Sequence, residues 1–444
     1  MKQMKRKKER GITLIALVVT IIVLIVLAGI SINLMFGANG IINRAKQSKT
    51  LTDQASINEQ KALGELDEQL EKYLEGLPEN TKDTKPGTIV KLKEEWKGKN
   101  KNTVYAVAIG DGEEVPVPGN GIDEGFYYVG GNLNTGVIIS DNLADKYDGK
   151  IDKTTYEYTT SLQGNQFVWI PCEESNYKKC NVWNGTTQTN GTLANTEWDT
   201  TTPEDEKIQI KKYGGFYVGR YEAGLASTIT EFITNQPHTE SNQVYNKNGI
   251  PQSKAGVIPW MFIDWTHAKA NAESMYNNDY VNSGLITGTQ WDVILNTMIA
   301  KKYPIKRGEE NGTMLESDMT NSQYWGNYKN TSITYNGRKT TAYVNKYWTL
   351  PPLGNTSSGR TSTYTDNQGD LLTTGASDET QKYHTFDIAG NLWEWTEEGA
   401  STNRVPRGGS YISDSSIYPA CYRGSGNEEY IGLDLGFRPV LYIK

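Results

Sequence analysis

Residues 386–395 read FDIAGNLWEW, and this stretch decides how the C-terminal part of the chain folds. The pair Gly390 and Asn391 is a turn signal, and the Trp-Glu-Trp that follows it is typical of a short aromatic strand. Two stretches of the same kind come later, RVPRGGSY at 404–411 and LGFRPVL at 435–441. Together they predict short strands that are connected by tight turns.

The same pattern extends back to about Gly125. Aromatic and β-branched runs alternate with Gly, Asn and Asp turns, as in GNQFVWIP at 164–171 and GGFYVGRYEAG at 214–224. Short runs between turns favour an irregular β-rich domain. Of the two tryptophans in the WEW stretch, Trp393 and Trp395, we expect one to belong to the core and one to the turn.

Two segments of this region have helical patterns instead. Residues 265–276 place small and apolar side chains on one face, with Asp264 as the expected N-cap. Residues 289–298 also point their apolar side chains to one side, with Thr289 as the expected N-cap. Helices and strands together predict an α+β fold.

The order of these motifs resembles the formylglycine-generating enzyme, or sulfatase-modifying factor, family. The resemblance covers residues 125–444, and AGNLWEW, RGGSY and LGFRP carry it most specifically. It implies a variant of the C-type lectin fold for this domain. Residues 78–124 before it are rich in Lys and Glu and contain several Pro and Gly, so they are expected to be a linker with a small hairpin.

In active members of that family, two cysteines that follow the Gly-Gly-Ser-aromatic motif hold a copper ion. The corresponding positions here are Ser413 and Tyr418, and a hydroxyl and a phenol cannot replace the thiolates that copper(I) prefers. We therefore expect no copper and no catalysis of this kind. The rival hypothesis is an extracellular oxidase whose thiol site has moved to Cys421 with Cys172 or Cys180. Whether Cys172 and Cys180 form a disulfide stays open.

The resemblance also implies one calcium ion at the turn before the WEW stretch. Its ligands would be the side chains of Asp387 and Glu394 and the carbonyl groups of Gly390 and Leu392. Oxygen ligands from a short turn suit Ca²⁺. The alternative is that Glu394 pairs with Arg407 or Arg438 and that no metal binds.

Lectin-type relatives often bind their ligands in the part of the fold that corresponds to residues 413–427. The candidate ligand-binding residues in this stretch are Asp414, Tyr418, Tyr422 and Asn427. The expected partner is an extracellular protein or a glycan. A nucleic-acid partner is not expected, because the net charge is −7 and no long basic stripe exists beyond the N-terminus.

The N-terminus differs from the rest of the chain. Residues 1–11 are a basic leader, and residues 12–35 carry no charge over roughly 36 Å of helix, enough to cross a membrane. The junction of Gly11 and Ile12 resembles the signal of type IV pilins and pseudopilins, in which a prepilin peptidase cuts after the glycine and methylates the new N-terminus. Ala16 stands where that family has a glutamate, which favours a minor or membrane-resident subunit.

An uncleaved signal anchor is the alternative to a prepilin-type segment. In either case the basic leader stays inside, and a helical pattern continues beyond the apolar run, so residues 12–77 are predicted to form a transmembrane and stalk helix. The sequence as a whole predicts a single-pass protein of the cytoplasmic membrane, associated with other pilin-like subunits. Its non-catalytic, lectin-like domain would face outward for adhesion or recognition.

Overall fold

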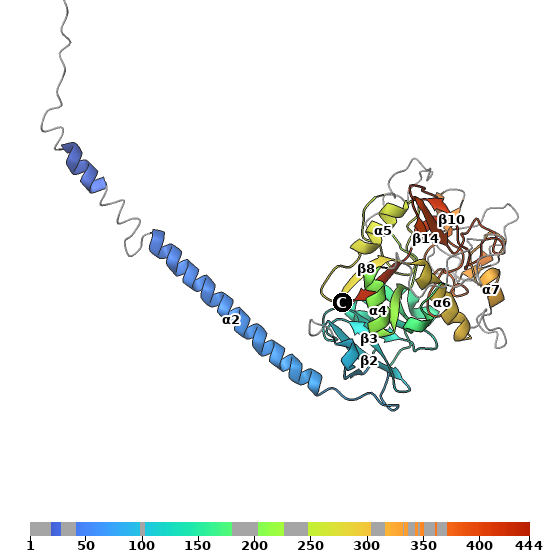
Figure 1. The fold of residues 1–444 in the computed structure, drawn as a ribbon, viewed down its shortest axis with the longest axis horizontal. Coiled ribbons are helices and arrows are strands. Elements are labelled where there is room, and N and C mark those ends of the chain that lie inside the picture. Colours follow the sequence, from blue (N-terminus) through green and yellow to red (C-terminus); the bar gives the residue numbers. More distant parts are fainter. Residues whose placement is uncertain are drawn as a thin grey trace, which may run out of the picture. The chain divides into compact units, whose positions relative to one another are not determined.

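The computed structural model describes residues 19–27, 41–97, 103–179, 203–225, 247–302, 316–331, 333–335, 342–344, 347–349, 360–361 and 371–444. The chain divides into two compact units, Met1–Leu77 and Pro78–Lys444. Each of them is described by itself, with the elements labelled as in Figure 1.

The first unit contains the long helix α2, Ile41–Glu75. The helix ends where the sequence predicts, because Gly76 follows it and donates its backbone N–H to the carbonyls of Lys72 and Tyr73. The predicted processing residues, Gly11 and Ile12, lie outside the described residues.

The predicted transmembrane helix is corrected by the structure. Among the residues that the structure describes, no helix combines the length and the apolar character needed to cross a membrane. The prediction of one transmembrane and stalk helix over 12–77, and with it the single-pass membrane location, is therefore wrong.

The second unit is built around a six-stranded antiparallel sheet in the order β4-β5-β6-β7-β18-β8 (Figure 1). Its strands are β4 (Tyr127–Gly130), β5 (Val137–Ser140), β6 (Gln166–Pro171), β7 (Gly215–Gly219), β18 (Pro439–Ile443) and β8 (Val281–Leu285). The last strand of the chain thus lies inside the sheet, between β7 and β8. Both faces of the sheet are buried, so its strands read as nearly continuous apolar runs.

One face of this sheet is covered by helix α6, Gly288–Ala300. Its side chains Trp291, Ile294 and Leu295 are fully buried and share one apolar cluster with Val168 and other inward residues of the sheet. Burial of each such side chain stabilises the fold by roughly 1.5–3 kcal/mol. Helix α6 therefore fixes the position of the loops at its two ends.

The other face is covered by a small sheet, β1-β2-β3, where the sequence predicted a linker. Its strands are β1 (Ile89–Val90), β2 (Val104–Gly110) and β3 (Glu113–Pro118). Its valines belong to the same apolar cluster as Phe167 and Trp169 of the central sheet. Residues 78–97 and 103–124 thus belong to a folded layer that covers the large side chains on this face of β6, and they include the predicted hairpin as β2 and β3.

The two predicted helices are present, with one difference at an N-cap. Helix α5, Trp265–Ser274, is capped as expected by Asp264, which accepts a hydrogen bond of 2.8 Å from the backbone N–H of His267. The N-cap of helix α6 lies two residues earlier than predicted. It is Thr287, which forms a capping box with Gln290, and Thr289 is inside the helix.

A second sheet, β16-β15-β14-β17, unites the three motifs that decide the fold. Its strands are β14 (Trp393–Ala400), β15 (Asn403–Arg407), β16 (Gly426–Asn427) and β17 (Leu435–Phe437). The WEW segment pairs with β15 on one side and runs parallel to β17 on the other. Trp395 is fully buried, as expected for one of the two tryptophans, whereas Trp393 is half-buried and belongs to strand β14 instead of the turn.

The remaining described elements are short. The helices are η1 (Glu94–Trp96), η2 (Leu143–Asp145), α3 (Tyr156–Thr159), η3 (Glu174–Asn176), α4 (Glu204–Tyr213) and α7 (Glu316–Thr320). The strands are β9 (Thr334–Tyr335), β10 (Ala342–Val344), β11 (Tyr347–Thr349), β12 (Arg360–Thr361) and β13 (Leu371–Leu372). The second unit is therefore α+β.

The position of β1-β2-β3 makes a truncation informative. A chain that starts at Pro78 should unfold cooperatively, whereas one that starts at Gly125 should not. Several buried valines are lost in the shorter chain, each worth roughly 1.5–3 kcal/mol, and together they approach the ~5–15 kcal/mol total stability of a typical domain. Urea unfolding followed by tryptophan fluorescence tests this. A cooperative transition of the 125–444 chain at the same midpoint would contradict it.

A second prediction concerns Glu206 in α4, which accepts a hydrogen bond of 2.6 Å from Thr287 at the start of α6. Burial raises the pKa of Glu206 from 4.5 to about 8. Because the folded pKa lies above the unfolded one, the stabilisation is complete below pH 4.5 and is lost as the pH rises towards about 8. The variant Glu206→Gln should therefore lose less unfolding free energy than the wild type between these pH values, by on the order of a few kcal/mol. The unfolding free energies of both proteins are measured by urea unfolding at several pH values. An equal dependence on pH in the two proteins would refute this.

Candidate functional site

The turn that precedes β14 is held in place by close backbone contacts. Gly390 has a positive φ of 74°, and a Cβ there would lie 2.2 Å from the carbonyl oxygen of Asn327. In the RGGSY motif, Gly409 has a φ of 73°, and a Cβ would lie 2.2 Å from the carbonyl oxygen of Tyr418. Only glycine fits these two positions, which brings the WEW strand and the segment around Tyr418 close together.

The structure places the predicted calcium ligands in a buried acidic cluster. The carboxylate of Asp387 accepts hydrogen bonds from the backbone N–H of Gly375 at 2.8 Å and from the hydroxyl of Thr380 at 2.7 Å. The carboxylate of Glu394 binds the guanidinium of Arg438 with both oxygens, at 2.5 and 2.9 Å. Of the two alternatives for Glu394, the structure therefore has the ion pair with Arg438.

A third acid of this cluster, Glu222, did not stand out in the sequence. It lies just after β7, and its carboxylate accepts hydrogen bonds from the side chain of Asn391 at 2.6 Å and the backbone N–H of Leu392 at 3.0 Å. Burial raises the pKa of Glu222 well above its usual value, and the nearby Asp387 and Glu394 raise it further. Burial raises the pKa of Glu394 to about 7, although Arg438 opposes this shift.

The residues present do not fit the predicted calcium ion as they are arranged. Both oxygens of Glu394 face a guanidinium, and those of Asp387 already accept two hydrogen bonds. Within the described part of the chain, no group of three or more His, Cys, Asp or Glu side chains could hold a metal. Calcium binding at Asp387, Gly390, Leu392 and Glu394 stays a prediction, and it would require Glu394 to leave Arg438.

The two positions that correspond to the copper-binding cysteines lie in the segment after the RGGSY motif. Ser413 is buried, and its hydroxyl lies 2.9 Å from that of Ser410, which in turn donates to the carboxylate of Asp434 at 3.0 Å. Tyr418 is 36% exposed. The first position is thus a polar contact of the core, and the second is a surface aromatic.

The described cysteines are both free and buried. Cys421 is completely buried, and burial raises the pKa of its thiol to about 12. The thiol of Cys172 also has a pKa raised by burial to about 12. Neither thiol is a ready thiolate near neutral pH. Cys180 lies outside the described residues.

Three aromatic residues pack edge to face beside the predicted ligand-binding stretch. The ring centroids of Trp393 and Tyr418 are 5.6 Å apart, those of Trp393 and Tyr422 are 5.9 Å apart, and those of Tyr418 and Tyr422 are 5.0 Å apart. We call Trp393, Tyr418 and Tyr422 the aromatic cluster. It joins β14 to the segment after RGGSY, and two of its members were predicted as ligand-binding residues.

The other two predicted ligand-binding residues have different surroundings. Asp414 begins the turn that carries the aromatic cluster, because its carbonyl accepts the backbone N–H of Tyr418 at 2.8 Å. Asn427 lies in strand β16 opposite Asn403 of β15, and its side chain accepts the N–H of Glu429. The structure thus brings Asp414, Tyr418 and Tyr422 into one segment, whereas Asn427 belongs to a sheet edge.

This segment is supported by hydrogen bonds from residues 322–330. The backbone N–H of Ser322 donates to the carbonyl of Ser415 at 3.2 Å, and Lys329 donates to the carbonyl of Ser413 at 3.1 Å. The side chain of Asn330 bonds both the backbone N–H and the hydroxyl of Ser415. These hydrogen bonds attach the segment to residues 322–330 at several points.

A buried network of ion pairs lies behind the aromatic cluster. Arg407 at the end of β15 binds Asp292 of α6 at 2.7 Å, and Arg423 binds both Asp292 and Glu398 of β14. The buried amine of Lys179 also lies 3.8 Å from Glu398, so among the described residues three bases face two acids in this network. The network connects α6, β14, β15 and the residues that follow the cluster.

The Arg438–Glu394 pair predicts a large mutational effect. Replacing Arg438 by Met leaves a buried carboxylate without its partner, so the free energy of unfolding should fall by about 3–5 kcal/mol. The double variant Arg438→Met with Glu394→Met should recover a large part of this loss. Urea unfolding measures both variants. If added calcium restored the stability of the single variant, Glu394 would be a calcium ligand after all.

Comparison with known proteins agrees with the motifs. Residues 156–443, more than half of the chain, match the family described as sulfatase-modifying factor enzyme 1-like domain. No curated protein matches the chain significantly. No comparison supports the prepilin-type segment predicted from Gly11 and Ile12, so the predicted pilin-related role is corrected.

The solved structures that match this chain do so at low sequence identity and with low TM-scores. Variable protein 1 of Treponema denticola is 13% identical, with 63% of this chain and 97% of that chain covered and a TM-score of 0.29. PvdO from Pseudomonas aeruginosa is 12% identical, with 52% and 81% covered and a TM-score of 0.26. The U1 variant of the major tropism determinant is 13% identical, with 81% and 87% covered and a TM-score of 0.23. Structures this dissimilar indicate nothing about the function of this chain. The match over residues 156–443 establishes that the chain belongs to the family of sulfatase-modifying factor enzyme 1-like domains.

Proposed function

We propose that this domain is a non-catalytic recognition domain that binds a protein partner through the aromatic cluster. The observation that carries the proposal is the replacement of a copper-binding position by Tyr418, an exposed ring that packs on the half-buried Trp393 and the buried Tyr422. Tyr and Trp present large, rigid contact areas at low cost in side-chain entropy, and they are enriched where proteins bind one another. The same position can therefore serve binding once it no longer serves chemistry.

The contacts that hold the aromatic cluster in place also favour binding. The segment that carries Tyr418 is held by residues 322–330, and Trp393 is held in a strand between β15 and β17. A surface that is already ordered loses little conformational entropy when a partner docks. Tyr418 is 36% exposed and Ile417 beside it is 55% exposed, so a partner could bury apolar area at this point.

The rival function is an oxidase with a relocated thiol site. It requires thiolates that a metal or a substrate can reach. Cys421 has no exposed surface and Cys172 only 7%, and the pKa of each thiol is raised by burial. These properties favour structural cysteines over catalytic ones.

The oxidase hypothesis has a direct test. The full-length protein should neither bind copper(I) in competition with a colorimetric chelator nor oxidise a cysteine-containing peptide in the presence of oxygen. A matched variant, Cys421→Ser, should behave like the wild type. Peptide oxidation that requires Cys421 would overturn the non-catalytic proposal.

The binding proposal can be tested without a known partner. A displayed library of random peptides is selected on the full-length protein, and the recovered peptides are then titrated against variants. Tyr418→Ala should weaken them roughly tenfold or more, as expected for an aromatic hot spot. Tyr430→Ala, at a tyrosine that is 52% exposed and lies outside the segment 413–427, is the control and should leave them unchanged. Equal loss in both variants, or a failure to recover any peptide whose binding depends on Tyr418, would contradict the proposal.

A further inference from the structure

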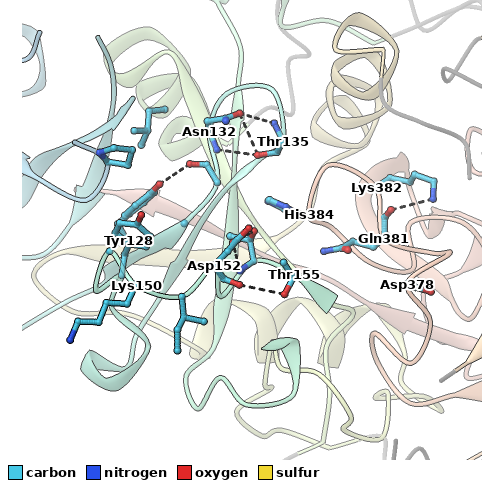
Figure 2. A pocket seen from close by; sticks show the side chains of 18 residues that line it. Tyr128, Asn132, Thr135, Lys150, Asp152, Thr155, Asp378, Gln381, Lys382 and His384 are labelled. Carbon is cyan, nitrogen blue, oxygen red and sulfur yellow. Dashed lines mark hydrogen bonds between the residues drawn. The ribbon is translucent and has the colours of Figure 1, made fainter. Parts of the chain in front are cut away.

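A cavity of about 620 Å³ opens elsewhere in the second unit, within the range of roughly 300–1,000 Å³ that is typical of small-molecule sites. Three loops line it, as Figure 2 shows: the β4–β5 turn with Asn132 and Thr135, the loop with Asp152 and Thr155, and the loop 378–384. None of the predicted site residues belongs to it. We call it the three-loop pocket.

The loop 378–384 contributes a donor that lacks a partner. The side-chain nitrogen Nε2 of Gln381 is buried, and it has no hydrogen-bond partner among the described residues. A buried donor without a partner costs roughly 1–3 kcal/mol, so native structures rarely leave one unless water or a ligand satisfies it. Figure 2 shows Gln381 on the opposite side of the pocket from Asp152.

Two further side chains of this loop are buried and line the pocket. The Nδ1 atom of His384 lies 2.7 Å from the carbonyl oxygen of Gly136, which can only accept, so Nδ1 carries the proton and Nε2 is an acceptor. Burial lowers the pKa of His384 to about 4, which keeps the ring neutral. The amine of Lys382 donates to the carbonyls of Glu379 and Gln381, and burial lowers its pKa to about 7.

The opposite wall supplies acceptors and an aromatic surface. One oxygen of Asp152 accepts hydrogen bonds from the backbone N–H and the hydroxyl of Thr154, which fixes the carboxylate at the pocket. The rings of Tyr128 and Tyr147 pack edge to face, with centroids 5.5 Å apart. The hydroxyl of Tyr128 donates to the carbonyl of Gly131 at 2.8 Å, so this wall is ordered as well.

From these groups we propose that the three-loop pocket binds a small, uncharged polyhydroxylated ligand, a monosaccharide or disaccharide in size. Each hydroxyl group both donates and accepts, so such a ligand can donate to Asp152 and His384 and accept from Gln381. Its C–H faces would contact Tyr128 and Tyr147. This site is independent of the aromatic cluster and of the function proposed for it.

Other ligand classes fit the pocket less well. Sulfate only accepts hydrogen bonds and a phosphate anion has at most two donor groups, so neither matches a wall whose carboxylate, Asp152, requires donors. The pocket lysines, Lys150 and Lys382, are offset by Asp152 and Asp378. A divalent cation needs several oxygen ligands together, and no such group of acidic side chains exists within the described ranges. A purely apolar ligand would leave the donor of Gln381 buried without a partner.

The test uses the full-length protein and a panel of methyl glycosides and disaccharides of common hexoses and N-acetylhexosamines. Saturation-transfer NMR should detect at least one of them, with a Kd of about 1 mM or below from titration. Asp152→Asn keeps the acceptor for Thr154 but exchanges the other oxygen for a donor. It should weaken binding roughly three- to tenfold, and Gln381→Leu should do the same.

Asp148→Asn is the matched control. Asp148 lies in the same loop as Asp152, accepts the backbone N–H groups of Lys150 and Ile151, and does not line the pocket. This variant should bind like the wild type, and near-UV circular dichroism verifies that all three variants are folded. The proposal is overturned if no sugar of the panel binds, if Asp148→Asn weakens binding as much as Asp152→Asn, or if inorganic phosphate displaces the sugar.

Discussion

The fold of the second unit depends on the guanidinium of Arg438. This residue is the one that separates β17 of the four-stranded sheet from β18 of the six-stranded sheet along the chain. It donates to the carbonyl of Gly219 in β7 at 3.0 Å, to the carbonyl of Phe386 at 2.9 Å, and to the carboxylate of Glu394 in β14. Because a guanidinium has five donors in a fixed plane, one side chain can set the angle between two sheets and the start of the turn before β14.

The charges around Arg438 are not balanced, because three acids face one guanidinium. Glu222, Asp387 and Glu394 surround one arginine, and burial raises the pKa of each of the three acids. Their oxygens accept backbone and side-chain hydrogen bonds, which offsets part of the cost of burial. In the network behind the aromatic cluster, Arg407, Arg423 and Lys179 face Asp292 and Glu398. The first cluster therefore has an excess of acids, and the second has an excess of bases.

The sequence predicts the elements that local patterns specify. The Gly-Asn turn and the WEW strand are present, and α5 begins at its predicted cap, Asp264, because each depends on neighbouring residues. The cap of α6 was predictable too. Thr287 followed by Gln290 three positions later is a capping-box pattern. Thr289 was predicted instead, because it lies closer to the apolar run.

The rest depends on contacts between distant residues. Residues 78–124 have the composition of a linker, and their role as a layer follows only from the large side chains of β6 that they cover. Glu222 meets Asn391 and Leu392 across about 170 residues, so no spacing rule indicates it. The aromatic cluster could be predicted in part, because Tyr418 and Tyr422 were expected at a binding position. The three-loop pocket could not, since its loops come from opposite ends of the domain.

One stretch of chain connects both proposed sites. Lys382 and His384 line the three-loop pocket, and Trp393 belongs to the aromatic cluster, nine residues after His384. The residues between them are fixed at Phe386 by Arg438 and at Asn391, which bonds to Glu222 and to the backbone of Leu372. A segment fixed at two points within so few residues cannot adapt freely at either end. The same buried polar groups therefore position both ends of this stretch, which reduces the conformational entropy that either proposed site would lose on binding.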